Sequence, residues 1–370
     1  MKIGILGGGQ LGRMFIQEAL KYSDEIHVLD PAAGCPCAYI SHFTQGDFNN
    51  FDDVLTFGKD KDVVTIEIEH VSVDALDALE RLGVRVVPKP SVIRMIQQKI
   101  LQKEFYTCNK IPSPDFEVMR SAKDEITFPL PFVQKLNTGG YDGKGVQVLK
   151  ERDAYKNLWP EPSVIESLVD IDKELSVIVA KNDSGQVKTF PVTEMVADPE
   201  LNLLDFNICP AEISEKTQQQ IDRITEQFID SIDSAGLFAI ELFLDKEGKV
   251  WVNETAPRLH NSGHQSQEGN SNSQFEQFYR VVTSSPLADT DACGFSGMLN
   301  LVGEPGYSGK VKYQGLEEVL KLPKTYVHLY GKTETRPGRK MGHINVLAES
   351  REALLEKLMR IKSLVKVVSE

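Results

Sequence analysis

The sequence predicts a multidomain protein that combines an α/β region with an α+β region. The first observation is length, because 370 residues exceed what one hydrophobic core usually holds, so two or three domains around a cleft are expected. The second is the alternation of strand and helix patterns over residues 1 to about 90, which is typical of a parallel sheet. The third is a change after Phe132 to short strands joined by turns such as residues 182–185, which indicates antiparallel pairing.

Apolar runs in the first 90 residues alternate with segments of helical spacing. In chain order, strands are expected at residues 3–6, 26–29 and 63–68, and helices at residues 11–20 and 73–82. Parallel strands joined by crossover helices produce this alternation, so we expect a doubly wound parallel sheet. Pro88 and Pro90 then interrupt the pattern, and a helical segment over residues 91–109 leads to a second proline-marked turn.

The later part of the chain contains one long amphipathic helix and a strand hairpin. The helix is expected over residues 214–235, with Gly236 just beyond its end. Two strands follow, joined by a turn at residues 245–248. A mixed section from about residue 295 ends in a helix after Ser350.

Composition limits the function classes. With 54 acidic against 41 basic residues the formal charge is −13, which opposes binding to nucleic acids. No stretch approaches the roughly 18 apolar residues of a membrane-spanning helix, and the N-terminus enters an apolar strand without a signal-peptide pattern. The chain is therefore expected to be cytoplasmic, without nucleic-acid or membrane partners, and its five cysteines are expected to be free thiols.

A glycine-rich loop with the spacing G-x-G-x-x-G spans residues 7–12, between an expected strand and helix, and Asp30 ends the next strand. Such a loop presents backbone N–H groups and a helix N-terminus to an anion. Three interpretations are open here: a nicotinamide dinucleotide site, a tight turn that binds nothing, and a loop that holds a substrate phosphate or other polar group. The rest of the chain favours the third.

A second glycine-rich segment spans residues 138–145 and follows an expected strand that contains Lys135. Its four glycines and Lys144 suit a flap that places backbone amides and ammonium charge over a triphosphate. The segment lacks the Gly-Lys-Ser/Thr ending of a Walker A loop. A plain hairpin turn is the alternative, because glycine and asparagine favour turns on steric grounds alone.

Two glutamates, Glu241 and Glu254, lie inside otherwise apolar strands of the predicted hairpin. Burying two unpaired carboxylates together is costly, and a divalent cation removes that cost. Mg²⁺ prefers oxygen ligands and lets substrate phosphates complete its octahedron. The pair therefore predicts a magnesium site, with Asn253 as a further oxygen contact; the alternative is a solvated outer face of the hairpin.

Two polar, glycine-punctuated segments carry cationic donors in this acidic protein. The first runs from Arg258 to His264, and the second covers residues 336–343 with Lys332 just before it. Arginine forks onto phosphate oxygens, so both segments suit a phosphorylated small substrate. Each alone is weak evidence, because a basic turn is usually a solvated loop.

Together these segments resemble the ATP-grasp superfamily and, within it, the N5-carboxyaminoimidazole ribonucleotide synthetases, the ATP-dependent carboxylases of de novo purine synthesis. The matching segments run along nearly the whole chain, at residues 7–14, 67–70, 138–145, 253–258, 260–264 and 336–343. The two histidine-containing motifs, His-Asn-Ser-Gly-His and Arg-Pro-Gly-Arg-Lys-Met-Gly-His, are far more specific than the glycine loops.

The resemblance implies an ATP-grasp fold with an N-terminal Rossmann-like, or pre-ATP-grasp, parallel-sheet domain. Four segments follow from it: a substrate-side domain at 1–95, linker helices and the lid at 96–190, a central ATP-grasp domain at 191–310, and a C-terminal section at 311–370 that packs back on the core. It also implies a homodimer.

The resemblance further implies site residues. ATP falls to Arg94, Lys135, Gly140, Tyr141, Asp142, Gly143, Lys144, Gly145, Val146, Glu166, Ser167, Leu168, Val169, Glu174, Glu194, Asn253 and Glu254. The aminoimidazole ribonucleotide falls to Gln10, Leu11, Glu67, Tyr141, His260, Asn261, Lys332, Arg339 and Lys340. Mg²⁺, or Mn²⁺ in its place, falls to Glu241 and Glu254, and catalytic roles fall to Lys135, Tyr141, Asp142, Lys144 and Arg258. Lys144 and Glu194 depart from the family, which often carries arginine and sometimes histidine there.

The implied chemistry begins with bicarbonate attacking the γ-phosphate of ATP to give carboxyphosphate. The carboxyl group then passes to the exocyclic amine of the ribonucleotide, with Asp142 or the departing phosphate as base. A formate-dependent glycinamide ribonucleotide transformylase is the alternative within the superfamily. An NAD(P)-dependent oxidoreductase built on the first loop would leave Glu241 and Glu254 without a role, and a non-catalytic nucleotide-binding module would not need them.

Overall fold

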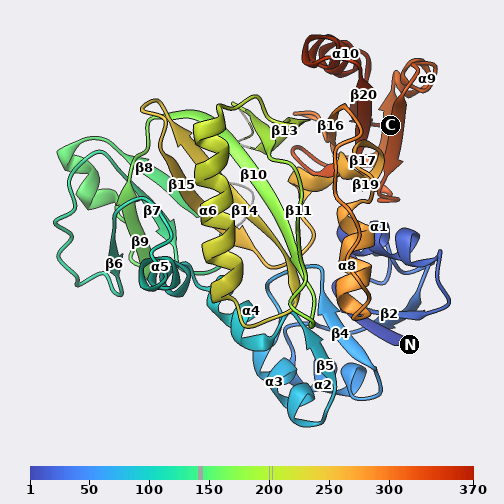
Figure 1. Cartoon of the computed structure of the whole chain (residues 1–370), viewed down its shortest axis with the longest axis horizontal. Coiled ribbons are helices and arrows are strands. Elements are labelled where there is room, and N and C mark those ends of the chain that lie inside the picture. The colour runs from blue at the N-terminus through green and yellow to red at the C-terminus, as the bar shows by residue number, and fades with distance from the viewer. Residues whose placement is uncertain (141–144, 200, 202) are drawn as a thin grey trace.

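The computed structural model describes residues 1–140, 145–199, 201 and 203–370 (Figure 1). Its N-terminal part is a sheet in the order β3-β2-β1-β4-β5, and every neighbouring pair is parallel. The elements are β1 (Lys2–Leu6), α1 (Gln10–Ala19), β2 (Glu25–Asp30), β3 (His42–Gln45), α2 (Phe51–Gly58), β4 (Val63–Ile66), α3 (Val73–Arg81) and β5 (Arg85–Val87). The predicted doubly wound parallel sheet is confirmed.

Both faces of this sheet are covered, as a parallel sheet requires. On one face, Phe57 of α2 and Leu79 of α3 belong to a buried cluster with the strands. On the other, Phe15 of α1 packs edge-to-face on Phe278 of α8 (Gln274–Val282), with ring centroids 5.5 Å apart. Because α8 belongs to the central part of the chain, the N-terminal sheet and the centre share one hydrophobic core.

Helices α4 (Pro90–Gln97) and α5 (Lys99–Cys108) connect the first sheet to a four-stranded antiparallel sheet, which we call the lid. Its strand order is β6-β9-β7-β8. Its elements are β6 (Phe116–Met119), β7 (Phe132–Leu136), β8 (Val146–Leu149), η1 (Arg152–Asn157) and β9 (Ser163–Ser167). The lid has a small core of its own, built on Met119, Phe132, Leu149 and Ile165.

A larger sheet occupies the centre, in the order β15-β14-β10-β12-β13-β16-β20-β18, with β11 beside β10. Its strands are β10 (Ile171–Lys181), β11 (Val187–Thr189), β12 (Thr193–Asp198), β13 (Leu203–Cys209), β14 (Gly236–Asp245), β15 (Val250–Ala256), β16 (Phe295–Val302), β18 (Thr325–Leu329) and β20 (Lys340–Ala348). Strand β10 lies in this sheet, although the predicted lid segment 96–190 included it. Its ladder with β14 runs almost its whole length and fixes it there.

The long helix α6 (Glu215–Ser231) lies along this sheet (Figure 1) and buries its apolar stripe against it. It begins at the predicted cap, where Ser214 accepts a hydrogen bond from the N–H of Thr217. It ends four residues before the predicted end, and Gly236 opens β14 instead. The Lys181 ammonium binds the carbonyls of Ile229 and Ile232 at 2.9 and 2.8 Å, so a side chain rather than a glycine satisfies the helix end.

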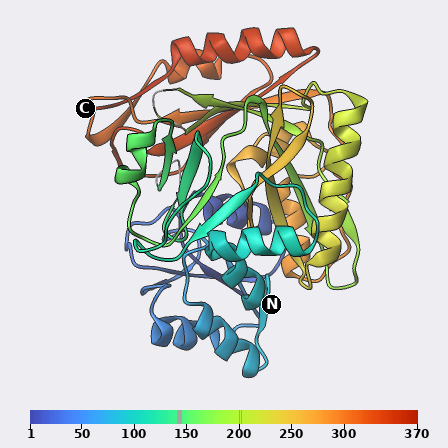
Figure 2. The ribbon, with the colours of Figure 1, turned by 90° about the vertical axis from the view of Figure 1, so that its left-hand side faces the viewer.

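The C-terminal section packs back on the central sheet through β18 and β20, as expected. Its other elements are β17 (Gly309–Gln314), α9 (Leu316–Leu320), β19 (Glu334–Thr335), α10 (Arg351–Leu364) and β21 (Lys366–Ser369). In Figure 2, α10 lies at one end of the molecule and the N-terminal sheet with α2 and α3 lies at the other. Among the described residues, no helix is both long and apolar enough to cross a membrane.

Candidate active site

The two predicted metal ligands meet on one face of the β14–β15 hairpin. Glu241 and Glu254 are direct cross-strand partners, which places their side chains on the same side of the sheet. The next pair is Leu242 with Val252, so Asn253 is the extra residue of a bulge. Its amide donates to Glu241 Oε2 at 3.3 Å. We call Glu241 and Glu254 the carboxylate pair.

Basic side chains lie against this pair. The ammonium of Lys99, at the start of α5, is 2.5 Å from Glu254 Oε2, and the His260 ring nitrogen Nε2 is 3.3 Å from Glu241 Oε1. The Lys99 ammonium holds the pKa of the Glu254 carboxyl well below its ordinary range. The Glu254 side chain is nevertheless 42% exposed, which leaves one side of the pair open to a ligand.

Lys135 of β7 connects the pair to a buried carboxylate. Its ammonium donates to Asn253 Oδ1 at 2.7 Å and lies 2.5 Å from Glu166 Oε1, while Lys103 Nζ is 2.6 Å from Glu166 Oε2. Burial raises the pKa of Glu166, but the two ammonium groups outweigh it and lower that pKa. Burial lowers the pKa of Lys103 to about 8 against the opposing effect of Glu166. Ser167 ends β9, and residues 168–170, with Leu168 exposed, link the lid to β10; Val169 lies in this link.

Glu174 lies on the same face of the central sheet as the carboxylate pair. Ser176 of β10 is the cross-strand partner of Glu241, and Glu174 lies two residues before Ser176 on the same strand. Burial, followed by the Glu241 carboxylate, raises the pKa of Glu174. The register therefore brings this predicted ATP contact toward the cluster.

Two predicted ATP contacts lie elsewhere. Glu194 is the partner of Leu175, so it points to the face opposite Glu174, where its carboxylate binds Lys173 and Arg351, each at 2.9 Å. Arg94 on α4 turns to α3, with its guanidinium 3.0 Å from Asp74 Oδ1 and 2.6 Å from Asp77 Oδ2. The ammonium beside Glu254 belongs instead to Lys99, five residues further along, and the ATP contact of Arg94 stays a prediction.

Arg258, predicted to be catalytic, is tied to the N-terminal domain. Its guanidinium is 2.6 Å from Glu69 Oε1, and it also donates to the Leu259 carbonyl at 2.9 Å. Tyr141, Asp142, Gly143 and Lys144 lie outside the described residues, so their predicted roles stay predictions. Their neighbours Gly140, Gly145 and Val146 connect β7 to β8, with Leu136 donating to the Gly145 carbonyl at 2.9 Å.

The loop at residues 7–12, which we call the glycine loop, already holds carboxylates of this chain. Gly9 and Gly12 donate to Glu67 Oε1 and Oε2 at 2.6 and 2.5 Å, and Gly8 donates to Asp30 Oδ2 at 2.8 Å. Burial raises the pKa of Glu67 more than these hydrogen bonds lower it. A Cβ at Gly9 would lie 2.3 Å from Glu67 Oε1, so the fit is close. The amides that would bind a dinucleotide pyrophosphate are therefore occupied.

The remaining predicted substrate residues come from several parts of the chain. Lys332 Nζ is 2.9 Å from Gln10 Oε1 and 2.7 Å from the Lys340 carbonyl, so the second basic segment meets the start of α1. Arg339 donates to the Glu334 carbonyl at 2.7 Å, and Leu11 is buried in the shared core. Asn261 adjoins His260, and its side-chain N and O atoms are buried without a hydrogen-bond partner.

Sequence reasoning missed Lys99 and Lys103. They lie four residues apart on α5, so they project from one face of that helix. The only local signal was two lysines at this spacing, ahead of a lid whose last strand contains Glu166. Lysines on exposed surface helices have the same spacing, so this signal was not specific. The carboxylates that these lysines contact come from β15 and β9.

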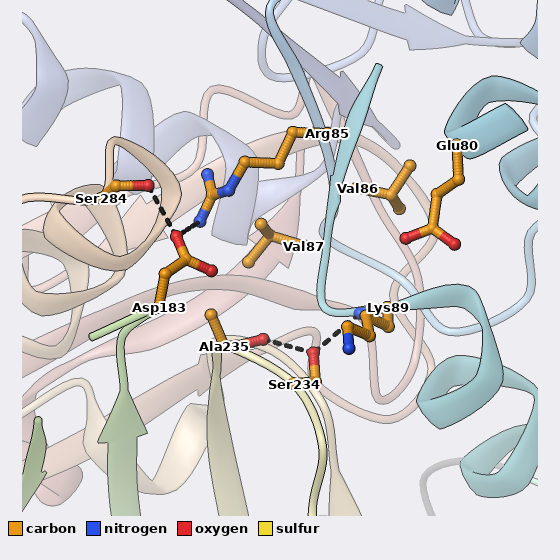
Figure 3. A pocket seen from close by; sticks show the side chains of 9 residues that line it. All are labelled: Glu80, Arg85, Val86, Val87, Lys89, Asp183, Ser234, Ala235 and Ser284. Carbon is orange, nitrogen blue, oxygen red and sulfur yellow. Dashed lines mark hydrogen bonds and ion pairs between the residues drawn. The ribbon is translucent and has the colours of Figure 1, made fainter. Parts of the chain in front are cut away.

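Two pockets among the described residues could serve as the functional site, and their lining residues distinguish them. A small enclosed pocket is lined by residues of the cluster, namely Lys99, Gln102, Lys103, Lys135, Val164, Glu166 and Asn253. Figure 3 shows a larger pocket elsewhere, where β5 meets the start of β14 and the turn after β10. Two of its charged groups pair with each other: Arg85 lies 2.7 Å from Asp183, which also accepts from Ser284 at 2.6 Å. The first pocket carries the candidate chemistry.

In comparisons with known proteins, three family models match three successive parts of the chain. Residues 1–97 match the model of the ribonucleotide synthetase preATP-grasp domain, residues 104–275 that of the ATP-grasp domain, and residues 296–357 that of the phosphoribosylaminoimidazole carboxylase C-terminal domain. The N5-carboxyaminoimidazole ribonucleotide synthase of Aquifex aeolicus is 34% identical over 99% of this chain and 97% of its own length. The chain spans 66% of the length of the phosphoribosylaminoimidazole carboxylase of Ogataea methanolica, at 34% identity over 94% of this chain.

Solved structures give the same result. The N5-carboxyaminoimidazole ribonucleotide synthetase of Thermotoga maritima superposes with a TM-score of 0.92 at 39% identity, covering 100% of this chain and 99% of that one. The N5-carboxyaminoimidazole synthase of Aspergillus clavatus, solved with ADP and 5-aminoimidazole ribonucleotide, has a TM-score of 0.86 at 30% identity, covering 97% and 98%.

Proposed function

Because the chain belongs to the N5-carboxyaminoimidazole ribonucleotide synthases, a family of ATP-grasp ligases, we propose that it uses ATP and bicarbonate to carboxylate 5-aminoimidazole ribonucleotide. The product would be N5-carboxyaminoimidazole ribonucleotide, on the route to IMP. One observation carries the proposal at the level of residues. The carboxylate pair, two lysines and Asn253 converge beside a pocket, as a site for a metal–nucleotide complex requires.

Mg²⁺, with Mn²⁺ as a substitute, is proposed to bind Glu241 and Glu254. Among the described residues, no group of three or more His, Cys, Asp or Glu side chains is arranged to hold a metal. Mg²⁺ commonly takes one or two carboxylates and fills its other positions with water and substrate phosphates, so a two-carboxylate site suits it. The chemistry that the ion supplies when bound is neutralisation of charge on the phosphate oxygens.

The cations now beside the carboxylates supply the other contacts. Lys99 and Lys135 lie 2.5 Å from Glu254 and Glu166, and both could turn to phosphate oxygens when a nucleotide enters. Lys103 would stay with Glu166 and keep that buried carboxylate neutralised. Lys332, beside Gln10, would meet the ribonucleotide phosphate, and the lid would exclude water from the labile carboxyphosphate.

In the proposed reaction a bicarbonate oxygen forms a bond to the γ-phosphorus, and the bond between that phosphorus and the ADP oxygen breaks. The amine nitrogen then bonds to the carboxyl carbon, the bond from that carbon to the bridging oxygen breaks, and phosphate leaves with that oxygen of bicarbonate. The amine proton passes to the departing phosphate or to Asp142. His260, 3.3 Å from Glu241, would lie where the two substrates meet. Its ring could hold the carbonyl group of carboxyphosphate during the transfer. A homodimer remains a prediction from the family, which sedimentation would test.

The two rival functions have less support. The relatives described above are synthases and carboxylases rather than formate-dependent transformylases. A nicotinamide cofactor would need the glycine-loop amides that Glu67 and Asp30 now occupy.

The decisive experiment supplies the enzyme with ATP, aminoimidazole ribonucleotide and ¹⁸O-labelled bicarbonate. We expect ADP release that requires both other substrates, and one ¹⁸O atom in the released phosphate. Parallel reactions contain formate with glycinamide ribonucleotide, or NAD(P)H. Turnover only with formate, or unlabelled phosphate, would overturn the proposal.

A further inference from the structure

Gln274, at the first turn of α8, clamps the backbone of His260. Its side-chain oxygen accepts from the His260 N–H at 3.0 Å, and its side-chain nitrogen donates to the His260 carbonyl at 2.8 Å. A backbone N–H only donates and a carbonyl only accepts, so these two bonds fix which way the amide points. The second hydrogen on that nitrogen then faces His264 Nδ1 at 3.1 Å. His264 must accept there, so it is neutral, with its proton on Nε2.

His264 is the first ring of a row that continues through His343, also buried, to the partly exposed His328. The ring centroids are 4.7 Å apart between His264 and His343, and 4.5 Å apart between His343 and His328 at an interplanar angle of 11°. Both nitrogens of His343 have partners, Tyr330 Oη and Gln267 Oε1, each at 3.0 Å. We call His264, His343 and His328 the imidazole stack.

Further hydrogen bonds tie the two ends of the stack together. His328 Nε2 is 3.0 Å from Glu268 Oε1. The Asn345 amide donates to Glu268 Oε2 at 2.7 Å and to the His264 carbonyl at 2.8 Å. Rotation or protonation of any one ring would therefore disturb partners on both of its sides.

The stack joins the two polar segments that surround the proposed ribonucleotide site. His264 follows η2 (Asn261–Gly263), next to His260. His343 lies in β20, which begins at Lys340, and its cross-strand partner His328 precedes Lys332 by four residues. The segment after β15, at one end of the central sheet, thus meets β20 and β18, at the other end, through the three histidine rings.

The geometry does not suit a metal site or a simple apolar core. In the part of the chain that the structure describes, no group of three or more His, Cys, Asp or Glu side chains is arranged to hold a metal, and the His343 and His328 rings stack nearly parallel instead of directing their nitrogens at one point. The nitrogens described above are instead bonded to side chains of this chain. A core that served only to fill space would use apolar side chains, which need no such partners.

We propose that the imidazole stack is a positioning element, which holds His260 against Glu241 and keeps it in register with Lys332 and Lys340. This inference rests on the proposed function. His264 acts through Gln274 on the His260 backbone, and His343 and His328 act through β20 and β18. None of the three rings is required to touch a substrate.

Protonation of the stack gives the inference a pH signature. Burial lowers the pKa of His264 and of His343, and for His264 the neighbouring His260, Lys340, His328 and Arg258 add to the shift. Glu268, bonded to His328, and Tyr330, bonded to His343, also face the stack. A histidine with a depressed pKa in the folded state gives full stability above its unfolded pKa of about 6.5 and loses it as pH falls below that value. The stack should therefore lose its hold on His260, Lys332 and Lys340 as the pH falls below about 6.5.

The first test compares His264→Asn with His264→Phe. Asparagine places an oxygen near the position of Nδ1 and can still accept from Gln274, whereas phenylalanine keeps a ring and loses the acceptor. We expect His264→Phe to lower kcat with ribonucleotide and bicarbonate by roughly 100-fold, as for a displaced catalytic contact, with KM for ATP within about threefold of the wild type. His264→Asn should recover most of the loss. His42→Phe, at an exposed histidine of β3, is the matched control. Equal losses in the two His264 variants, or none in His264→Phe, would overturn the inference.

The second test covers the case in which His264→Phe does not fold. Gln274→Glu has nearly the same shape, but its carboxylate replaces the nitrogen that donates to both the His260 carbonyl and His264. It therefore weakens the clamp at every pH and, in addition, favours the protonated His264 ring. The pH at which half of kcat/KM for the ribonucleotide is lost should move upward by about one unit or more. A fall in kcat/KM that is the same at every pH, with no shift of the pH at which half of it is lost, contradicts the proposal. If the wild type shows no ribonucleotide-dependent turnover at all, the proposed function has failed rather than this inference.

Discussion

The glycine loop and the carboxylate pair both hold charged groups of this chain, but they hold them in different ways. In the loop, backbone amides bind the Glu67 carboxylate at 2.5 and 2.6 Å, and a Cβ at Gly9 would collide with it. At the pair, Lys99 reaches Glu254 through a long side chain, and Glu254 stays 42% exposed. Amides fixed by the backbone keep their partner, whereas a flexible ammonium can exchange it.

This difference explains why the G-x-G-x-x-G motif, although easier to recognise in the sequence than the carboxylate pair, does not mark the proposed catalytic site. The G-x-G-x-x-G spacing predicts an anion at the start of α1, and an anion is there, but it is Glu67. The carboxylate pair has no named motif, yet its neutralising groups are ones that a metal–nucleotide complex can replace. Three predictions test the contrast, from the largest expected effect to the smallest.

Glu254→Gln breaks the exchangeable side of the comparison. We expect kcat to fall on the order of 1,000-fold, because the variant loses the charge that holds the proposed cation and leaves Lys99 without its partner. Steady-state ATP hydrolysis at several Mg²⁺ concentrations measures the effect. Glu247→Gln, in the exposed turn of the same hairpin, is the control and should match the wild type. Wild-type turnover of Glu254→Gln at limiting Mg²⁺ would rule out a ligand role.

Lys99→Met and Arg94→Met sharpen the assignment of the cation. Loss of a charge-assisted contact costs about 2–3 kcal/mol, so KM for ATP should rise on the order of 50-fold in Lys99→Met. Arg94, paired with Asp74 and Asp77 and 38% exposed, should change KM by no more than about twofold. The family resemblance pointed to Arg94, so the reverse order of effects would restore that assignment. Isothermal titration with ADP and Mg²⁺ gives an independent measure.

Glu67→Ala breaks the fixed side. Removing the acceptor of two N–H groups at the start of α1 should lower the free energy of unfolding by about 1–2 kcal/mol. Urea denaturation measures the loss, with Glu226→Ala on the exposed face of α6 as the control. The KM for ATP should stay unchanged, because the loop is not the proposed nucleotide site. A large increase in that KM would remove the contrast between the two regions.

Local sequence predicted the parts of the fold and site whose cause is local. Glu241 and Glu254 were predictable because a single hairpin fixes their register. The parallel sheet followed from the alternation of patterns in the first 90 residues. The end of α6 was not predictable in this way, because the group that satisfies it is Lys181, far away in the sequence.

The contacts of the site itself depend on tertiary structure. Lys99 meets a carboxylate 155 residues away, and no periodicity encodes that distance. Resemblance named Arg94 as an ATP contact, which stays a prediction, and gave no sign of Lys99, whose partner comes from β15. Glu194 lies on the far face for a similar reason: the register of β12 against β10, which the sequence does not reveal, decides the face.

The cores described above also determine which part of the molecule can move. Phe15 and Phe278 belong to one core that spans the N-terminal sheet and the central sheet, and Tyr22 stacks on Tyr279 beside it at 4.1 Å. The lid, with its small core around Phe132, has no share in that cluster. Backbone amides of the lid should therefore exchange with deuterated solvent by sub-global opening, while those of the two joined domains exchange only when both unfold together as one cooperative unit.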